Sequence, residues 1–180
     1  GYDLVAANSD VTAAEVKLMT FFSRETRLRS ALENYKSKYD YIFIDCPPSL
    51  NMLTVNAMTA ADSVLVPMQC EYYALEGLTA LIDTISKLAS VINHELKIEG
   101  ILRTMYDPRN RLSSDVSDQL KKHFGDKVYR TIIPRNIRLA EAPSFGSPII
   151  YYDKSSSGAK AYLALAGEIL RREEQRNTIE

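Results

Sequence analysis

The sequence predicts an α/β fold in which a mostly parallel sheet carries helices on both faces. Apolar, strand-like runs alternate with amphipathic, helix-like segments about five times, and the connections between them are short. The chain has 180 residues, of which 46% are hydrophobic and 25% are charged, the balance of a folded globular protein. This length leaves little room for two cores, so we expect a single α/β domain over residues 1–180.

The elements expected in the first part of the chain are short. Residues 2–6 form an apolar run that predicts a strand. Thr12 and Glu15 have the spacing of a capping box, so a helix is expected to begin at Thr12. Apolar side chains at helical spacing predict a second helix over residues 27–35.

A continuous apolar run over residues 39–45 ends on Asp45. This pattern is typical of a strand that is buried on both faces of a parallel sheet. Pro47 and Pro48 end the predicted strand, because proline cannot donate a backbone hydrogen bond to a neighbouring strand.

Strands and helices alternate regularly in the rest of the chain. Apolar runs predict strands over residues 63–67, 98–105 and 128–133. The helical spacing of apolar residues predicts helices over residues 52–61, 75–92, 114–124 and 157–172. The mixed-charge segment 171–176 is expected to be a solvated, fraying helix end.

Net charge and cysteine usage exclude several classes of protein. The formal net charge of −1 excludes a globally basic nucleic-acid binder but not a local basic patch. The longest apolar runs are far shorter than the ~20 residues of a membrane span. Cys46 and Cys70 are too few for a disulfide scaffold, and both follow apolar runs, so we expect reduced, buried thiols. His94 and His123 lie far from them in the sequence, and no metal-ligand spacing is visible.

Ligands of open α/β sheets bind beyond the carboxyl ends of the strands, and three predicted strand ends are unusual here. The first is the apolar run ending on Asp45, a Walker-B arrangement that places a carboxylate where it can hold hydrated Mg²⁺ beside phosphates. A turn-forming aspartate explains the same residues. The second is the polar and aromatic segment 66–77, which acids in the first turn of a helix also explain.

The third unusual feature is a group of arginines after two consecutive strands: Arg109, Arg111, Arg135 and Arg138. The carboxyl ends of parallel strands meet at one rim of a sheet, so we expect these side chains on the same rim. Guanidinium forks suit the phosphate oxygens of a nucleotide or of DNA. Ordinary surface arginines that pair with Asp107 or Glu141 and only brace their loops are the alternative.

Three long strings of residues, 40–50, 69–78 and 132–149, resemble signature segments of the ParA/Soj chromosome- and plasmid-partitioning ATPases. The resemblance runs over essentially the whole chain. It implies a dimeric P-loop ATPase of the deviant Walker-A class, with ATP and Mg²⁺ as cofactors of the complete protein. We expect this chain to bind neither of them tightly, and we expect no membrane partner. It also implies a cytoplasmic, nucleoid-associated homodimer that binds DNA without sequence specificity and that a ParB-type partner stimulates.

The resemblance also assigns roles to individual residues. It matches Asp45 to the Walker-B acid, which holds Mg²⁺ through water. Its other matches are Pro47, Pro48 and Ser49 to the switch segment, Pro134, Arg135 and Asn136 to the loop near the adenine, and Arg109 and Arg138 to DNA-contacting arginines. Arg111 is expected to assist these arginines.

The sequence departs from the family pattern in three ways. No G-x-x-x-x-G-K-[ST] motif occurs, the second acidic segment of the family is missing, and Asn51 stands where the family usually has glycine. The first two are expected to lie upstream, so the fold is predicted to be P-loop NTPase-like without its N-terminal P-loop strand and helix. This chain alone is then not expected to hydrolyse ATP. Its unpaired strands are expected to cause a non-native pairing, a swapped or associated oligomer, or low stability.

Two other interpretations stay open. A MinD-like positioning ATPase would end in a membrane-binding amphipathic helix, whereas residues 171–180 lack a large apolar face. A non-catalytic interaction protein would keep the fold without ATPase activity, and nucleotide binding by the purified chain would distinguish it.

Overall fold

The computed structural model describes residues 1–8, 10–47 and 49–178. The chain divides into two compact units, and each is described by itself. One unit comprises Gly1–Val64 and Thr84–Lys97, and the other comprises Leu65–Asp83 and Ile98–Glu180. The second unit contains the body of the sheet.

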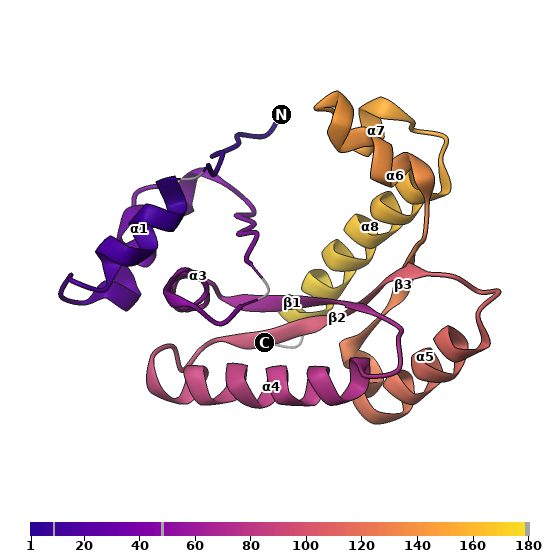
Figure 1. The fold of residues 1–180 in the computed structure, drawn as a ribbon, viewed down its shortest axis with the longest axis horizontal. Coiled ribbons are helices and arrows are strands. Elements are labelled where there is room, and N and C mark those ends of the chain that lie inside the picture. The colour runs from indigo at the N-terminus through magenta and orange to yellow at the C-terminus, as the bar shows by residue number, and fades with distance from the viewer. Residues whose placement is uncertain (9, 48, 179–180) are drawn as a thin grey trace. The chain divides into compact units, whose positions relative to one another are not determined.

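A three-stranded parallel sheet forms the centre of this second unit (Figure 1). Its strands are β1 (Ser63–Gln69), β2 (Lys97–Tyr106) and β3 (Val128–Pro134), in the order β1-β2-β3. These are the three strands predicted after residue 62, so the parallel α/β fold is confirmed.

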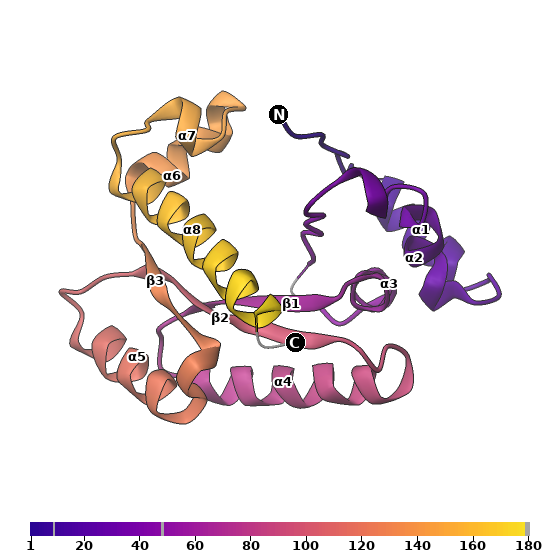
Figure 2. The same cartoon turned by 180° about the vertical axis from the view of Figure 1, so that it is seen from behind.

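Helices cover both faces of the sheet. α5 (Arg111–Phe124) and the first turns of α4 (Ala74–Val91) lie on one face, and α8 (Ser157–Asn177) lies on the other (Figures 1 and 2). Leu102, Tyr129, Ile133 and Leu165 form a buried cluster on the α8 face. Removal of such apolar side chains from water is the main driving force of folding.

Charged side chains also hold α8 against the sheet. The Glu168 carboxylate accepts hydrogen bonds from the backbone N–H groups of Arg130 and Thr131 in β3, each at 2.8 Å. Burial opposes ionisation of Glu168, but the hydrogen bonds outweigh it and lower the pKa of this carboxyl below its ordinary value. Near the end of the helix, Arg176 pairs with Glu99 at 2.6 Å. The helix end is exposed, as predicted, but this ion pair attaches Arg176 to the sheet.

Short helices that the sequence did not predict connect β3 to α8. They are α6 (Ile137–Glu141) and α7 (Ile149–Tyr152), joined through a 3₁₀ turn over Ala142–Phe145. Helices of this length are too short to show a helical period in the sequence. Further 3₁₀ turns lie at Arg24–Thr26, Lys36–Lys38 and Gly125–Lys127.

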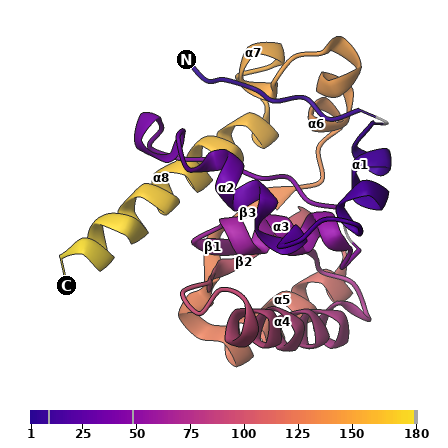
Figure 3. The same ribbon diagram turned by 90° about the vertical axis from the view of Figure 1, so that its left-hand side faces the viewer.

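The first unit is built around α3 (Met52–Ala60). α1 (Asp10–Leu18) and α2 (Arg27–Leu32) precede it, and α2 lies beside α3 (Figure 3). The buried Asn56 amide joins these segments, because it donates to the carbonyl of Arg24 at 2.8 Å and accepts from the N–H of Leu28 at 3.1 Å. α1 begins at Asp10 rather than at Thr12, since the side chain of Asn8 accepts the Asp10 N–H at 2.9 Å.

The two strands predicted in this unit are not formed by the described residues. Residues 2–6 and 39–45 belong to no strand, and their side chains are largely exposed, Val5 at 97% and Phe43 at 78%. Cys46, expected to be buried, is exposed as well, whereas Cys70 is buried. A strand persists only where a neighbour takes up its backbone N–H and C=O groups, and no described segment does so here.

Candidate functional site

The loops that follow β2 and β3 lie side by side at one rim of the sheet. Tyr106 and Pro134, the last residues of the two strands, are register partners. The backbone N–H of Arg135 then donates to the carbonyl oxygen of Tyr106 at 3.0 Å, which joins the two loops directly. The structure thus brings the two arginine-bearing loops together, as their positions after consecutive strands predicted.

In the loop after β2, Asp107 holds Arg109. The Nε and Nη2 atoms of Arg109 donate to the two carboxylate oxygens at 3.0 and 2.8 Å, and its backbone N–H donates to Oδ1 at 3.0 Å. The hydrogen bonds from Arg109, chiefly those of its side chain, lower the pKa of Asp107 to about 2. The Arg109 side chain is 87% exposed, so it faces solvent while a carboxylate occupies one side of its fork.

Arg111 and Arg135 are rim arginines for which the described part of the chain shows no bound carboxylate. Arg111 is exposed and begins α5, which Asn110 caps by accepting the N–H of Leu112 at 3.1 Å. Arg135 is also exposed, and its charge contributes to the low pKa of Asp107. Both guanidinium groups are available to an anion from solvent.

The loop after β3 is fixed at both of its ends. Pro134 closes the strand, and Asn136 caps α6 by accepting the N–H of Leu139 at 3.2 Å. The side-chain amide of Asn136 also donates to Ser157 Oγ at 2.8 Å, which ties the loop to the start of α8. The segment 134–136 is therefore a braced turn rather than a free loop.

Acidic groups surround Arg138. Its Nη1 donates to Glu141 at 2.9 Å, and its Nε lies 3.5 Å from a carboxylate oxygen of Asp153. The Tyr152 hydroxyl donates to the same Glu141 carboxylate at 3.1 Å. The hydrogen bond to Glu141 raises the pKa of Arg138 further above its ordinary value. The sequence identified Glu141 as a possible partner but not Tyr152, the last residue of the unpredicted helix α7, or Asp153, which follows it.

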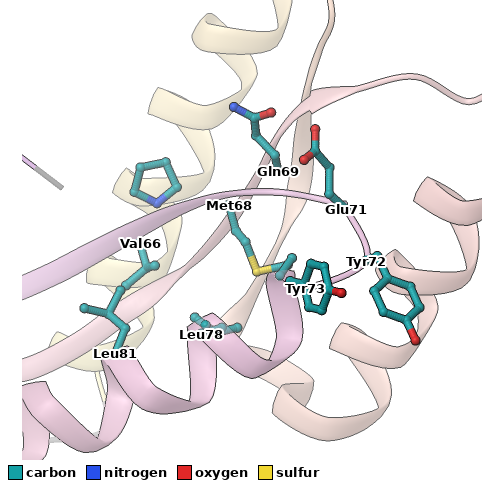
Figure 4. Close-up of a pocket in the computed structure, with 11 residues that line it drawn as sticks. Val66, Met68, Gln69, Glu71, Tyr72, Tyr73, Leu78 and Leu81 are labelled. Atoms are coloured by element: carbon teal, nitrogen blue, oxygen red, sulfur yellow. The ribbon is translucent and has the colours of Figure 1, made fainter.

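A pocket of about 460 Å³ lies where β1 ends and α4 begins (Figure 4). Its lining includes the apolar and aromatic residues Val66, Met68, Tyr72, Tyr73, Leu78 and Leu81, with Gln69 and Glu71 as polar members. The rings of Tyr72 and Tyr73 meet edge to face, with centroids 4.9 Å apart, and both are exposed. Glu76 lies in the first turn of α4, so the helix-start interpretation of this segment also holds.

Asp45 and the residues that follow it, as far as Val64, belong to the first unit. Asp45 is exposed in an irregular stretch, because the strand expected before it is not formed. Pro47 is exposed, and Pro48 lies outside the described residues. The carbonyl oxygen of Ser49 accepts a hydrogen bond from Thr54 Oγ1 at 2.7 Å, which joins this segment to α3.

Asn51, which stands where glycine was expected by resemblance, has a local structural role. Its Oδ1 accepts the N–H of Thr54 at 3.0 Å and thereby caps α3. Its side-chain amide donates to Glu15 at 3.2 Å, which links α3 to α1.

Among the described residues, no group of three or more His, Cys, Asp or Glu side chains is placed to hold a metal ion. Asp45 is not at the end of a strand, and the printed sequence has no P-loop to surround phosphates. Within the same residues, no helix is both long and apolar enough to cross a membrane.

Comparison with known proteins gives matches over most of the chain. A family model described as an AAA domain matches residues 1–98. The chromosome partitioning protein ParA of Caulobacter vibrioides (strain NA1000 / CB15N) is 52% identical over 98% of this chain and 67% of its own length. The sporulation initiation inhibitor protein Soj of Bacillus subtilis (strain 168) is 54% identical over 93% of this chain and 66% of its own length. This chain thus spans about two thirds of the length of these relatives.

The fold also matches a solved structure, the cobyrinic acid a,c-diamide synthase from Mycobacterium smegmatis with bound ADP and magnesium. The TM-score is 0.75, and the two sequences are 36% identical. The match covers 93% of this chain and 61% of that one.

Proposed function

The chain belongs to the ParA/Soj family of chromosome-partitioning ATPases, and we propose that in a protein of full family length it provides a sequence-independent DNA-binding surface. That protein would act in chromosome or plasmid segregation as an ATP-dependent homodimer, together with a ParB-type partner. We propose that the full-length protein is cytoplasmic and associated with the nucleoid.

One observation carries the DNA-binding proposal. Arg109 and Arg135 lie on two loops that a backbone hydrogen bond joins at one rim of the sheet, and Arg111 and Arg138 lie in the first turns of the helices that follow these loops, α5 and α6. A chain with a net charge of −1 needs such a focused basic patch to hold a polyanion. Dimer symmetry would double the patch, and contacts to backbone phosphates carry no base information. Binding should therefore be strong at low salt and independent of sequence.

We further propose roles for the nucleotide-related residues, on the basis of family membership. Pro134, Arg135 and Asn136 would lie near the adenine, and Asp45 would hold Mg²⁺ through water. Pro47, Pro48 and Ser49 would form the switch segment. Mg²⁺-ATP would supply the energy for dimerisation and release when it is bound.

The DNA-binding proposal is tested by a salt titration of duplex binding in the full-length protein with ATP. Arg109→Ala and Arg138→Ala should each weaken binding and lower the salt slope by about 1 for each phosphate contact removed. Arg171→Ala is the matched control, since it removes an exposed arginine near the far end of α8. If both rim variants dimerise normally and keep the parent's affinity and slope, these arginines only brace their loops.

The catalytic proposal is tested by measuring phosphate release. The 180-residue chain should show no meaningful ATP turnover, because P-loop N–H groups and lysine provide most of the β- and γ-phosphate stabilisation. In the full-length protein, Asp45→Ala should abolish Mg²⁺-dependent turnover, whereas Asp62→Ala, which removes another exposed aspartate of the same unit, should not. Turnover by the 180-residue chain at the full-length rate would contradict this assignment.

A further inference from the structure

The Asp107–Arg109 pair has the geometry of an arginine bound to an anion. Two N–H groups on one side of the guanidinium meet two oxygens of one group, at 3.0 and 2.8 Å. A DNA phosphate presents its two free oxygens to arginine in the same bidentate way. The carboxylate of Asp107 therefore occupies one of the two edges of the Arg109 guanidinium that can bind a phosphate in this way.

We propose that Asp107 limits the DNA affinity of this rim by competing with backbone phosphates for the guanidinium of Arg109. This inference rests on the proposed DNA-binding function and identifies the residue that sets its strength. A phosphate that binds Arg109 in bidentate fashion displaces the Asp107 carboxylate, and the displaced charge then repels the same phosphate.

Two observations favour competition over a permanent brace. The Arg109 side chain is 87% exposed, and exposed ion pairs are weak, so the guanidinium can swing away at little cost. Asp107 is more enclosed, with 26% of its side chain exposed, and its Oδ1 also accepts the backbone N–H of Arg109 at 3.0 Å. The acid is therefore the fixed partner, and the arginine is the mobile one.

The competing charge is present at all physiological pH values. The pKa of Asp107 is about 2, with the hydrogen bonds from Arg109 as the main cause and the charge of Arg135 as a smaller one. Arg135 acts on the same carboxylate through its charge, from the neighbouring loop, so an incoming phosphate that replaces the acid would meet two guanidinium groups.

The test is Asp107→Asn in the full-length protein with ATP, measured by fluorescence anisotropy on a 20-base-pair duplex. Asparagine keeps the Oδ1 acceptor of the turn, removes the charge, and replaces the oxygen that accepts from Arg109 Nη2 with an NH₂ donor. At about 0.1 M salt the variant should bind roughly fivefold more tightly, with a salt slope steeper by up to about 1 for each protomer. Asp107→Ser, which also keeps a turn acceptor, should act in the same direction.

The control is Asp115→Asn, which removes the same charge from an exposed position on α5 that shows no ion pair among the described residues. It should change affinity much less. In an Arg109→Gln background, Asp107→Asn should lose most of its effect, because the guanidinium that it frees is gone.

The outcomes separate this inference from the proposed function. If the parent binds the duplex and Asp107→Asn binds no more tightly than Asp115→Asn, the competition is refuted and DNA binding stands. A gain that persists in the Arg109→Gln background also refutes it, since the effect would then be general charge. If neither the parent nor Asp107→Asn binds DNA as an ATP-bound dimer, both proposals fail.

Discussion

Arg103 of β2 lies inside the second unit, the one that contains the body of the sheet. The residue is only 2% exposed. Its Nη1 donates to Ser117 Oγ on α5 at 2.8 Å, and its Nη2 donates to the carbonyl oxygens of Tyr129 and Arg130 in β3 at 2.8 and 3.1 Å. Burial lowers the pKa of this guanidinium. Among the described atoms its Nε has no hydrogen-bond partner. The side chain thus joins two strands and a helix through neutral oxygens.

Removing Arg103 should be strongly destabilising. Arg103→Ala leaves a cavity and removes the donor from two buried acceptors and one partly buried acceptor, so the free energy of unfolding should fall by about 3–5 kcal/mol. Ser117→Ala removes one of the same hydrogen bonds and should cost about 1 kcal/mol. Urea unfolding followed by circular dichroism measures both. Equal costs for the two variants would show that Arg103 is only a packed side chain.

At the scale of single residues, the sequence predicted the positions of the rim arginines well, but it did not predict which polar side chains are buried. The positions of Arg109 and Arg138 after strands, and Asp107 and Glu141 as their possible partners, were readable because each pair is close in sequence. The burial of Arg103 could not be predicted in this way, because its hydrogen-bond partners lie 14 to 27 residues away in the sequence.

At the scale of elements, prediction succeeded where a segment packs against another segment of the described chain. β1, β2, β3, α3, α4, α5 and α8 all appear within a few residues of their expected bounds. The runs at 2–6 and 39–45 have equally good strand patterns, but a strand depends on a neighbour, which the pattern of one segment cannot reveal.

The contact between α8 and α6 depends on Gly158. A Cβ added there would lie 2.5 Å from Cγ of Leu139, a branched carbon that cannot easily move aside. Gly158→Ala should therefore lower the free energy of unfolding by about 1–3 kcal/mol, against the usual helix preference for alanine.

The matched control lies in the same helix. At Gly167 the nearest atom to an added Cβ is Nη1 of Arg171, at 3.2 Å, which is the end of a flexible side chain. Gly167→Ala should raise the free energy of unfolding by about 0.5–1 kcal/mol. The midpoints of thermal and urea unfolding of both variants, compared with those of the parent, test these predictions. A Gly158→Ala variant more stable than the parent would mean that α8 and α6 are not closely packed at this position.

On the scale of the whole molecule, burial is unequally distributed along the chain. Before Thr54, none of the side chains whose exposure the structure describes, those of residues 1–8, 10–11, 13–47 and 49–53, is buried. Large apolar side chains are exposed there instead, including Tyr2, Val5, Phe22, Ile42 and Phe43. Contiguous exposed apolar segments of this kind favour association.

The 180-residue chain should therefore self-associate at micromolar concentration, as sedimentation velocity would show. Ile42→Ser combined with Phe43→Ser should reduce the association, because it interrupts the longest exposed apolar run. Ile137→Ser combined with Phe145→Ser removes two exposed apolar side chains from the second unit. This double variant should reduce self-association less. A parent chain that stays monomeric over a hundredfold concentration range would contradict the prediction.

The hydrogen bonds from β3 to Glu168 have a consequence for how the sheet can be extended. β1 and β3 are the two edges of the three-stranded sheet. At the β3 edge, the N–H groups of Arg130 and Thr131 are already taken by a side-chain carboxylate, so an incoming strand would find them occupied. Strand addition is therefore disfavoured at this part of the β3 edge, and we expect growth of the sheet at the β1 edge instead.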